Sequence, residues 1–445
     1  MSAHTLLAII FWCLSAALAI FVLVEHFMRK QDLISLRNFF LLGFILFQTH
    51  SAALGLYLEN TDPYPVDRPV ESGAKFLAMA SLFLVVFLFA YRKGWLVIGL
   101  ARKFPTSKAV PSTVTLMMLA IVMSLIAVPL RFALLVPVIG VVSSIVAVGF
   151  AAISNGLVGW VWGRRLTNPF VAIIGVLVLA MNIGTVIVQQ FGRRPLVAVL
   201  AALLWGMYFS HWRYLPPIAM LRRLVLIGTA GVIVLALFTA VRGHGAKELS
   251  VGEMFRRMSR ADLTFGLELL AGGQQTAAAS LWAIENYPHT DLETRHLMTI
   301  RYMFLINIPR MWWPNKPFPL SSHVVKYARI GQVSRNITLP PGILGYAAAE
   351  GGWYAVVVYA VFLALFLRFF DALLVTYPYS PFVVMPIGCA LGQVVGLPRG
   401  DTSAFANTIV LTFLGTWLFM IAIGKVVEMT AVSRHIHRIE VADTG

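Results

Sequence analysis

Acidic residues are scarce in this sequence and missing altogether from its middle. Only 19 of the 445 residues are Asp or Glu, and none of them lies between Ala74 and Lys247. Carriers driven by protons or sodium usually place carboxylates at mid-membrane depth as coupling sites. Glu25 and Asp371 stand near the ends of apolar runs, where we expect them to be solvated at an interface. This distribution disfavours an ion-coupled transporter.

Cysteine and charge as a whole are also sparse. The two cysteines, Cys13 and Cys389, both lie in apolar runs, which predicts neither a disulfide framework nor a metal site. Only 12% of the residues are charged, whereas 59% are hydrophobic, more than a soluble core can bury. No His-x-x-x-His or paired-Asp signature is present. We therefore predict an all-α polytopic membrane protein without a metal or other cofactor.

Apolar runs of roughly 20 residues predict about eleven transmembrane helices. The expected extents are 5–27, 38–57, 74–91, 110–130, 132–153, 168–188, 196–213, 223–241, 352–370, 382–398 and 404–424, with 150–166 ambiguous. No basic residue precedes the first run, which indicates a retained span and not a cleaved signal peptide. We expect three parts: N-terminal helices at 1–241, a large outer segment at 242–351, and C-terminal helices with a tail at 352–445.

The net charge of +16 comes largely from short loops on one side of the predicted spans. Such clustering is an orientation signal of membrane proteins, so the basic balance does not indicate a nucleic-acid partner. The basic loops are 28–37, 92–108, 163–165, 222–223 and the tail from 425. The acidic stretch 59–71 and the large segment fall on the opposite side. We predict an outer N-terminus and a cytoplasmic C-terminus.

Several arginines oppose this tendency, because the predicted topology places them at the outer boundary. They are Arg131, Arg193, Arg194, Arg242, Arg301, Arg310 and Arg399. Arginine commonly extends its head group to an interface, which accounts for any single one of them. Guanidinium also binds phosphate oxygens in a two-point geometry and keeps its charge at any working pH. The set as a whole suggests a membrane-embedded substrate that carries a pyrophosphate.

The stretch "PRMWWPNKPFPL" at 309–320 holds four prolines, a density that excludes regular helix and strand. Arg310 and Lys316 offer contacts to phosphate or carboxylate, and Trp312 and Trp313 offer either a sugar platform or an interfacial anchor.

The segments on either side of this stretch are apolar or rich in glycine. "RYMFLINIP" at 301–309 is apolar enough to lie on the bilayer surface or dip into it. "LPPGILGYAAAEGG" at 339–352 returns the chain to the membrane through irregular backbone, which is tolerated there only under a cover of protein or in a wet cavity. We therefore expect the outer segment to roof a cavity.

"IPRMWWPNKP" at 308–317, followed by "LPPGILGYAAAEGG", resembles the pattern of bacterial oligosaccharide repeat-unit polymerases, the Wzy-type O-antigen and exopolysaccharide polymerases. That family combines many spans with one dominant periplasmic loop. Its re-entry element often has an acid before the aromatic residue. This sequence has Tyr346 at the corresponding place and Glu350 four residues later.

The resemblance implies glycosyl transfer at the periplasmic face of the bacterial inner membrane. The substrate it implies is an undecaprenyl-diphosphate-linked oligosaccharide, bound by a protein embedded in the lipid bilayer. A chain-length regulator and a flippase are the further partners it suggests. Fixed cations would stabilise the departing diphosphate, and a base within hydrogen-bonding reach would take the proton of the acceptor hydroxyl.

The residues leave alternatives open for each role. Arg242 is the leading diphosphate ligand, with Arg310, Lys316, Arg399 and Arg131 as further contacts. The base candidates are Glu350, whose other role would be packing against the loop, and His244, whose other role would be that of a solvated loop residue; His323 and His296 are weaker candidates.

Two other functions compete with polymerisation. An O-antigen ligase or another lipid-linked-sugar glycosyltransferase shares the chemistry, and such enzymes often use acids in the first outer loop, where Asp62 and Asp67 stand. A glycolipid flippase or exporter tends to show internal repeats, and this sequence has no apparent repeat.

Overall fold

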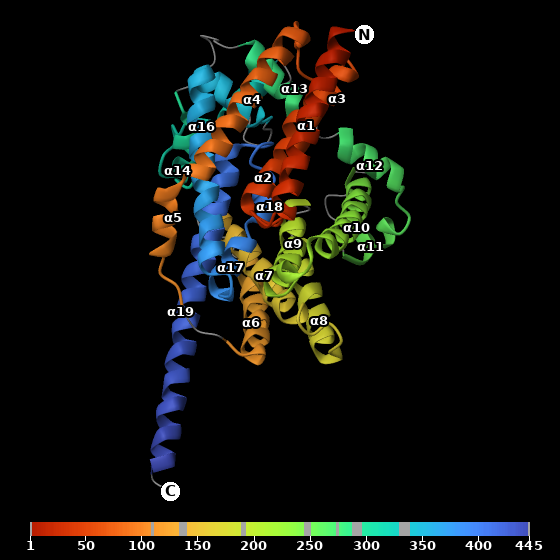
Figure 1. Cartoon of the computed structure of the whole chain (residues 1–445). Coiled ribbons are helices and arrows are strands. Elements are labelled where there is room, and N and C mark those ends of the chain that lie inside the picture. The colour runs from red at the N-terminus through yellow and green to blue at the C-terminus, as the bar shows by residue number, and fades with distance from the viewer. Residues whose placement is uncertain are drawn as a thin grey trace. The chain divides into compact units, whose positions relative to one another are not determined.

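The computed structural model describes residues 2–107, 111–132, 140–187, 193–243, 251–272, 276–286, 296–328 and 339–443. Every regular element in these ranges is a helix (Figure 1). Nine of the described helices are long and apolar enough to cross a membrane: Ala3–Phe27, Leu36–Tyr57, Pro69–Lys93, Thr113–Phe132, Val142–Trp162, Pro169–Val186, Pro217–Val241, Gly342–Thr376 and Thr402–Met429. Shorter apolar helices at Pro195–Ser210 and Pro381–Val394 overlap the seventh and tenth expected spans but are not long enough to be counted with the nine. The chain is an all-α multi-pass membrane protein.

The fifth span was placed too early in the sequence, at 132–153. Helix α7 covers Gly140–Trp162 and therefore takes in most of the ambiguous stretch 150–166. Ser154 and Asn155 in that stretch obscured the apolar signal, yet both are buried and hydrogen-bonded inside the protein. The hydroxyl of Ser154, for example, donates to the carbonyl of Ala120 at 2.6 Å.

The chain forms two compact units, each assembled from distant segments. Unit 1 comprises Met1–Val97, Leu221–Phe369 and Gln393–Thr408, and unit 2 comprises Ile98–Met220, Phe370–Gly392 and Ile409–Gly445. The expected division at 241 and 351 follows chain order, whereas these units join N-terminal and C-terminal helices. The long helices α16 (Gly342–Thr376) and α19 (Thr402–Asp443) have residues in both units.

Unit 2 is built around α7, which contacts the helices α6, α8, α9 and α17. Its elements are α6 (Thr113–Phe132), α7, α8 (Pro169–Ile187), α9 (Arg193–Ser210), the 3-10 turn η3 (Trp212–Tyr214) and α17 (Pro381–Gly388). Small residues permit this close packing. A Cβ added at Gly159 would lie 2.1 Å from the carbonyl oxygen of Leu203, so glycine is required there.

Unit 1 contains the first helices, up to α4, and the described part of the outer segment. The elements that lie wholly within it are α1 (Ala3–Phe27), α2 (Leu36–Phe44), the π-helix η1 (Ile45–His50), α3 (Ser51–Tyr57), α4 (Pro69–Lys93), α11 (Val251–Met258), α12 (Leu263–Gly272), α13 (Thr276–Glu285), α14 (Met298–Leu305) and α15 (Leu320–Tyr327). Helices α5 (Trp95–Arg102), α10 (Pro217–Gly243) and α18 (Leu391–Val394) lie at its boundaries.

Glu25 does not have the interfacial solvation expected for it. It is buried, and its carboxylate lies 2.6 Å from Nη2 of Arg37 and 3.1 Å from Nη2 of Arg92. The three residues come from α1, α2 and α4. Position along one span could not reveal this ion pair, because its partners belong to two other helices.

The outer segment shares a small hydrophobic core with the first outer loop. Its buried members come from that loop, α13, α15 and the start of α16: Tyr64, Ala278, Ala279, Trp282, Ala283, Leu320, Val324, Ala328, Tyr346 and Ala349. At the edge of this core, the carboxylate of Glu285 accepts the backbone N–H groups of Asp67 at 3.0 Å and Arg68 at 2.6 Å. In Figure 1, α13 accordingly lies beside α3 and α4.

The expected irregular return to the membrane at 339–352 is mostly helical. Helix α16 begins at Gly342 and stays regular to Glu350, and its break is confined to the next two glycines. Gly352 has φ 59° and ψ −138°, a conformation open to glycine alone. The break divides α16 into a short outer part and a long apolar part, and it leaves Glu350 at the junction.

Candidate functional site

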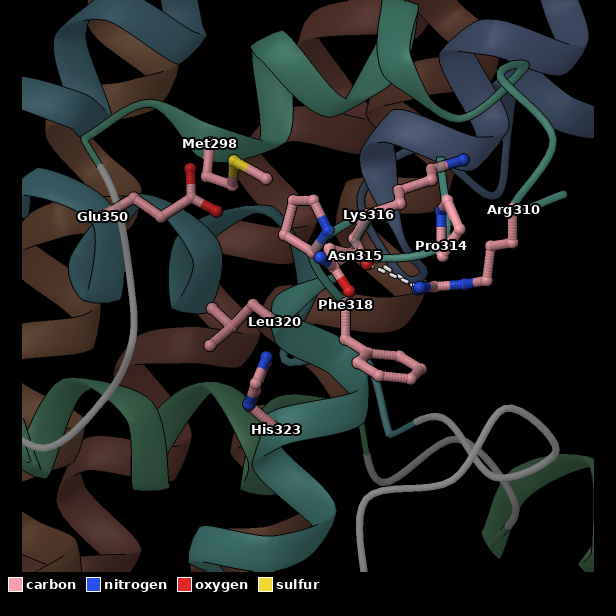
Figure 2. Close-up of a pocket in the computed structure, with 10 residues that line it drawn as sticks. Met298, Arg310, Pro314, Asn315, Lys316, Phe318, Leu320, His323 and Glu350 are labelled. Atoms are coloured by element: carbon pink, nitrogen blue, oxygen red, sulfur yellow. Dashed lines mark hydrogen bonds between the residues drawn. The ribbon is translucent and has the colours of Figure 1, made fainter. Parts of the chain in front are cut away.

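A cavity of about 640 Å³ lies within unit 1, beneath the proline-rich stretch 309–320 (Figure 2). Its lining residues are Met298, Arg310, Pro314, Asn315, Lys316, Pro317, Phe318, Leu320, His323 and Glu350. Most of them belong to that stretch, so the rigid backbone expected from its prolines forms one wall. Met298 and Glu350 lie on the opposite side in Figure 2. The volume is typical of small-molecule sites, which hold roughly 300–1,000 Å³.

Arg310 is fixed by its own loop. Its Nη1 donates to the carbonyl of Lys316, and its Nη2 donates to the carbonyl of Pro317 at 3.3 Å. The guanidinium also lies 4.2 Å from the ring centre of Phe318, a cation–π distance. These contacts use two of the five N–H groups of the guanidinium and hold its plane at the cavity wall. Arg310 is thus a preorganised positive charge.

Lys316, expected to contact phosphate or carboxylate, is hydrogen-bonded to backbone carbonyls. Its ammonium is buried and donates to the carbonyls of Ile306 and Ile308, each at 2.9 Å. Burial and, second, the charge of Arg310 lower the pKa of Lys316 from its usual value. The side chain therefore ties the end of α14 to the proline-rich stretch, and its charge adds positive potential at the cavity wall.

The two tryptophans lie away from the cavity. Trp312 is 70% exposed and Trp313 is partly buried. Among the described lining residues neither tryptophan appears. Of the two roles open to them, a sugar platform or an interfacial anchor, their placement favours the anchor for Trp312.

Glu350 faces the cavity but already has three hydrogen-bond donors. Its carboxylate accepts the backbone N–H of Thr299 at 2.8 Å, the hydroxyl of Thr299 at 2.6 Å and the hydroxyl of Tyr359. Residue Leu297, at the N-cap of α14, offers no side-chain cap of its own. Glu350 therefore takes over the capping of α14, as acidic groups commonly do at helix N-termini.

Asp401 was not singled out as a site residue, yet it lies in the same unit and joins two elements near the cavity. It precedes α19 and accepts the N–H groups of Ser403 at 3.1 Å and Ala404 at 3.3 Å. Its other oxygen accepts the hydroxyl of Ser321, on α15, at 3.3 Å. Burial raises the pKa of Asp401. The sequence signal was an Asp directly before an apolar helix, which is an N-cap pattern.

His323 is the histidine that the structure brings to the cavity. It comes from α15, and its ring lies 6.4 Å from that of Phe318 in an edge-on arrangement. His296 is exposed and does not belong to the described lining. His244 lies outside the described residues.

The remaining arginine candidates are not gathered at this cavity in the described part of the chain. Arg399 lies with its guanidinium 5.3 Å from the ring of Phe47. Arg131 belongs to unit 2, where it is buried and donates to the hydroxyl of Ser144. Arg242 is the last residue but one of α10, and its side chain lies outside the described part.

Comparisons with models of known protein families, with curated proteins and with solved structures found no match.

Proposed function

We propose that the cavity binds the diphosphate of a lipid-linked oligosaccharide, and that the protein polymerises undecaprenyl-diphosphate-linked repeat units into O-antigen or exopolysaccharide. This assigns the cavity to the periplasmic face of the bacterial inner membrane, in a chain of eleven spans with an outer N-terminus and a cytoplasmic C-terminus. The observation that carries the proposal is the fixed guanidinium of Arg310 at the wall of a cavity built by 309–320.

The proposed reaction moves a glycan from its lipid diphosphate to a sugar hydroxyl. The hydroxyl oxygen forms a bond to the anomeric carbon of the donor, and the bond from that carbon to the diphosphate oxygen breaks. The diphosphate leaves with the electron pair, and the hydroxyl proton passes to a base or to water. Negative charge grows on the diphosphate, so a cation held in place beforehand lowers the barrier without reorganisation.

Arg310 has the main electrostatic role in this proposal, and the neighbouring charge of Lys316 supports it. Glu350 and His323 are the two cavity residues that could accept the proton. Glu350 has little capacity left, because three donors already occupy its carboxylate. Its assignment as the base stays a prediction.

The decisive variant is Arg310→Ala, assayed with purified protein and a lipid-linked repeat unit. Loss of the guanidinium should reduce turnover by about 10²–10³, or roughly 3–4 kcal/mol of transition-state stabilisation. Arg310→Lys should recover little of it, because an ammonium cannot reproduce the two-point geometry.

Arg260→Ala is the matched control. Arg260 is an exposed arginine outside the described lining, so its loss should leave turnover unchanged. Arg310 also braces its own loop, so the thermal unfolding of each variant must be measured in parallel. Full turnover by a folded Arg310→Ala protein would refute the electrostatic role.

A ligase remains the second candidate because the first outer loop packs on α13 and carries exposed acids at Asp62 and Asp67. A ligase would use the same donor but a different acceptor. Assays that offer a second lipid-linked repeat unit or another glycolipid as the acceptor separate the two. A flippase would move the lipid-linked unit and leave the glycan length unchanged.

A further inference from the structure

Three large apolar side chains project from residues 304–312, which we call the tip. Phe304 is 66% exposed, and Met311 and Trp312 are each 70% exposed. Grouped exposure of this kind marks an interaction surface, whereas scattered single residues do not. Arg301, one turn before Phe304 on α14, is exposed on the same helix face. The face is thus amphipathic, with a cation next to apolar groups.

The tip is held rigidly from its inner side. Lys316 donates to the carbonyls of Ile306 and Ile308. The side-chain amides of Asn307 and Asn407 pair reciprocally at 2.7 and 3.0 Å. Asn407 belongs to the first turns of α19, so the tip is bound to a helix long enough to span a membrane. The exposed side chains are presented by a fixed backbone.

Helix α14 lies beside the long part of α16 and against the first turns of α19. A small hollow is lined jointly by α14, α16 and α19, through residues that include Met303, Phe362 and Ala406. Phe362 follows the break at Gly352 by ten residues, which corresponds to about 15 Å of helix. The hydrocarbon core is only about 30 Å thick. If the long part of α16 crosses the membrane, α14 reaches into the same leaflet as the outer half of that span.

The surface of α16 near the break also exposes aromatic and apolar side chains. Trp353 is 49% exposed, Tyr354 is 65% exposed and Val357 is 36% exposed, all within the first turns after the break. Tryptophan and tyrosine concentrate at the membrane–water boundary, where their rings meet both phases. The apolar tip therefore adjoins a span whose own exposed face has the composition of a membrane boundary.

We propose that the tip inserts into the outer leaflet of the bilayer, with Phe304, Met311 and Trp312 in contact with lipid and Arg301 at the headgroups. The occupant of this surface is lipid, because the tip borders a membrane span and combines exposed aromatic, aliphatic and cationic groups within a dozen residues. The insertion does not depend on the proposed function. It would place the cavity at headgroup level, where a lipid-linked ligand could reach Arg310 with its chain still in the bilayer.

The test uses the full chain in lipid nanodiscs, with an environment-sensitive fluorophore on Met311→Cys. The background is Cys13→Ser, because Cys389 is buried and Cys13 is exposed. The background protein without an introduced cysteine must stay unlabelled. Asn315→Cys is the matched control, four residues away and exposed at the cavity rim. Spin-labelled lipids quench a fluorophore in the bilayer, and iodide quenches one in water.

We expect the fluorophore at 311 to emit at shorter wavelength than that at 315 and to be quenched at least threefold more by spin-labelled lipid. Equal quenching by iodide at the two positions would overturn the proposal. So would a fluorophore at 311 shielded from both quenchers, since that result indicates a protein partner or a second copy. The two ideas can fail separately. Loss of lipid quenching at 311 in a protein that still polymerises would refute the insertion alone. Lipid quenching at 311 in a protein whose Arg310→Ala variant keeps full turnover would refute the role of Arg310 alone.

Discussion

Glu350 and Thr299 are joined by two hydrogen bonds across 51 positions of sequence. One carboxylate oxygen accepts the backbone N–H at 2.8 Å, and the other accepts the hydroxyl at 2.6 Å. The pair fastens the first turn of α14 to the break in α16. The hydroxyl of Tyr359 adds a third donor, so a carboxylate with about four acceptor positions has roughly one left.

This arrangement makes Glu350→Gln a sharp test of the base role. The amide oxygen can take the place that accepts the Thr299 N–H and the Tyr359 hydroxyl, while the amide N–H₂ donates to the Thr299 hydroxyl. The hydrogen bonds survive, but proton acceptance is lost. We expect turnover within about tenfold of wild type, because the carboxylate is occupied, whereas loss of a general base costs about 10²–10⁴.

Glu350→Ala supplies the comparison. It leaves the Thr299 and Tyr359 donors without a partner, and unpaired buried groups cost about 1–3 kcal/mol each. Thermal unfolding in detergent should therefore fall for Ala and stay close to wild type for Gln. A stable Gln variant with turnover reduced a hundredfold or more would instead establish Glu350 as the base.

Asp401 should make stability fall as pH rises from acid toward neutral. Burial raises the pKa of Asp401 in the folded state above the usual 3.8. Between pH 3.8 and this raised pKa, the carboxyl holds its proton in the folded chain and loses it in the unfolded chain. The stability due to its protonated form is present at low pH and is lost as pH rises through the folded pKa. Its titratable neighbours are Tyr302, Tyr346 and Glu350.

Asp401→Asn isolates this contribution. Asparagine is an equally good N-cap, and its amide can donate to the Ser321 hydroxyl in place of the second carboxylate oxygen. The difference in unfolding free energy between the variant and wild type should grow in favour of the variant as pH rises. A difference independent of pH would show that Asp401 ionises in the folded state as readily as in water.

Gly352→Ala should destabilise the protein at the break in α16. A side chain at φ 59° and ψ −138° costs about 1–3 kcal/mol. Gly231→Ala on α10 is the control, because an added Cβ there has no neighbour within 4 Å, so its unfolding temperature should not fall. Equal stability of the two variants would mean that the break relaxes without cost.

Orientation can be read from the labelling of single cysteines in intact cells. Asn315→Cys and Lys103→Cys, both at exposed positions, replace polar residues in the Cys13→Ser background. The charge distribution predicts that a membrane-impermeant maleimide reaches 315 from outside and reaches 103 only after lysis. Labelling of 103 in intact cells would reverse the assignment of the cavity to the periplasmic face.

Composition and apolar run length were enough to predict an all-α multi-pass membrane protein, because lipid exposure demands apolar helices wherever the chain crosses. Local pattern also located the proline-rich stretch that forms the cavity wall. The same reasoning placed the fifth span wrongly and left Glu25 at an interface. The hydrogen-bond partners of the buried polar residues of α7 and the ion-pair partners of Glu25 come from other helices.

The sequence by itself determined the class of protein, the rigid character of 309–320 and the presence of cations within it. Only the tertiary structure decided which backbone carbonyls each cation binds. Arg310 and Lys316 are alike in sequence terms and both line the cavity, yet Arg310 donates to carbonyls of its own stretch and Lys316 donates to those of Ile306 and Ile308. The reason is physical. The burial of apolar side chains can be predicted from residue types at regular spacing along one helix. A side-chain hydrogen bond depends instead on which backbone groups the fold brings together, and sequence periodicity does not predict that.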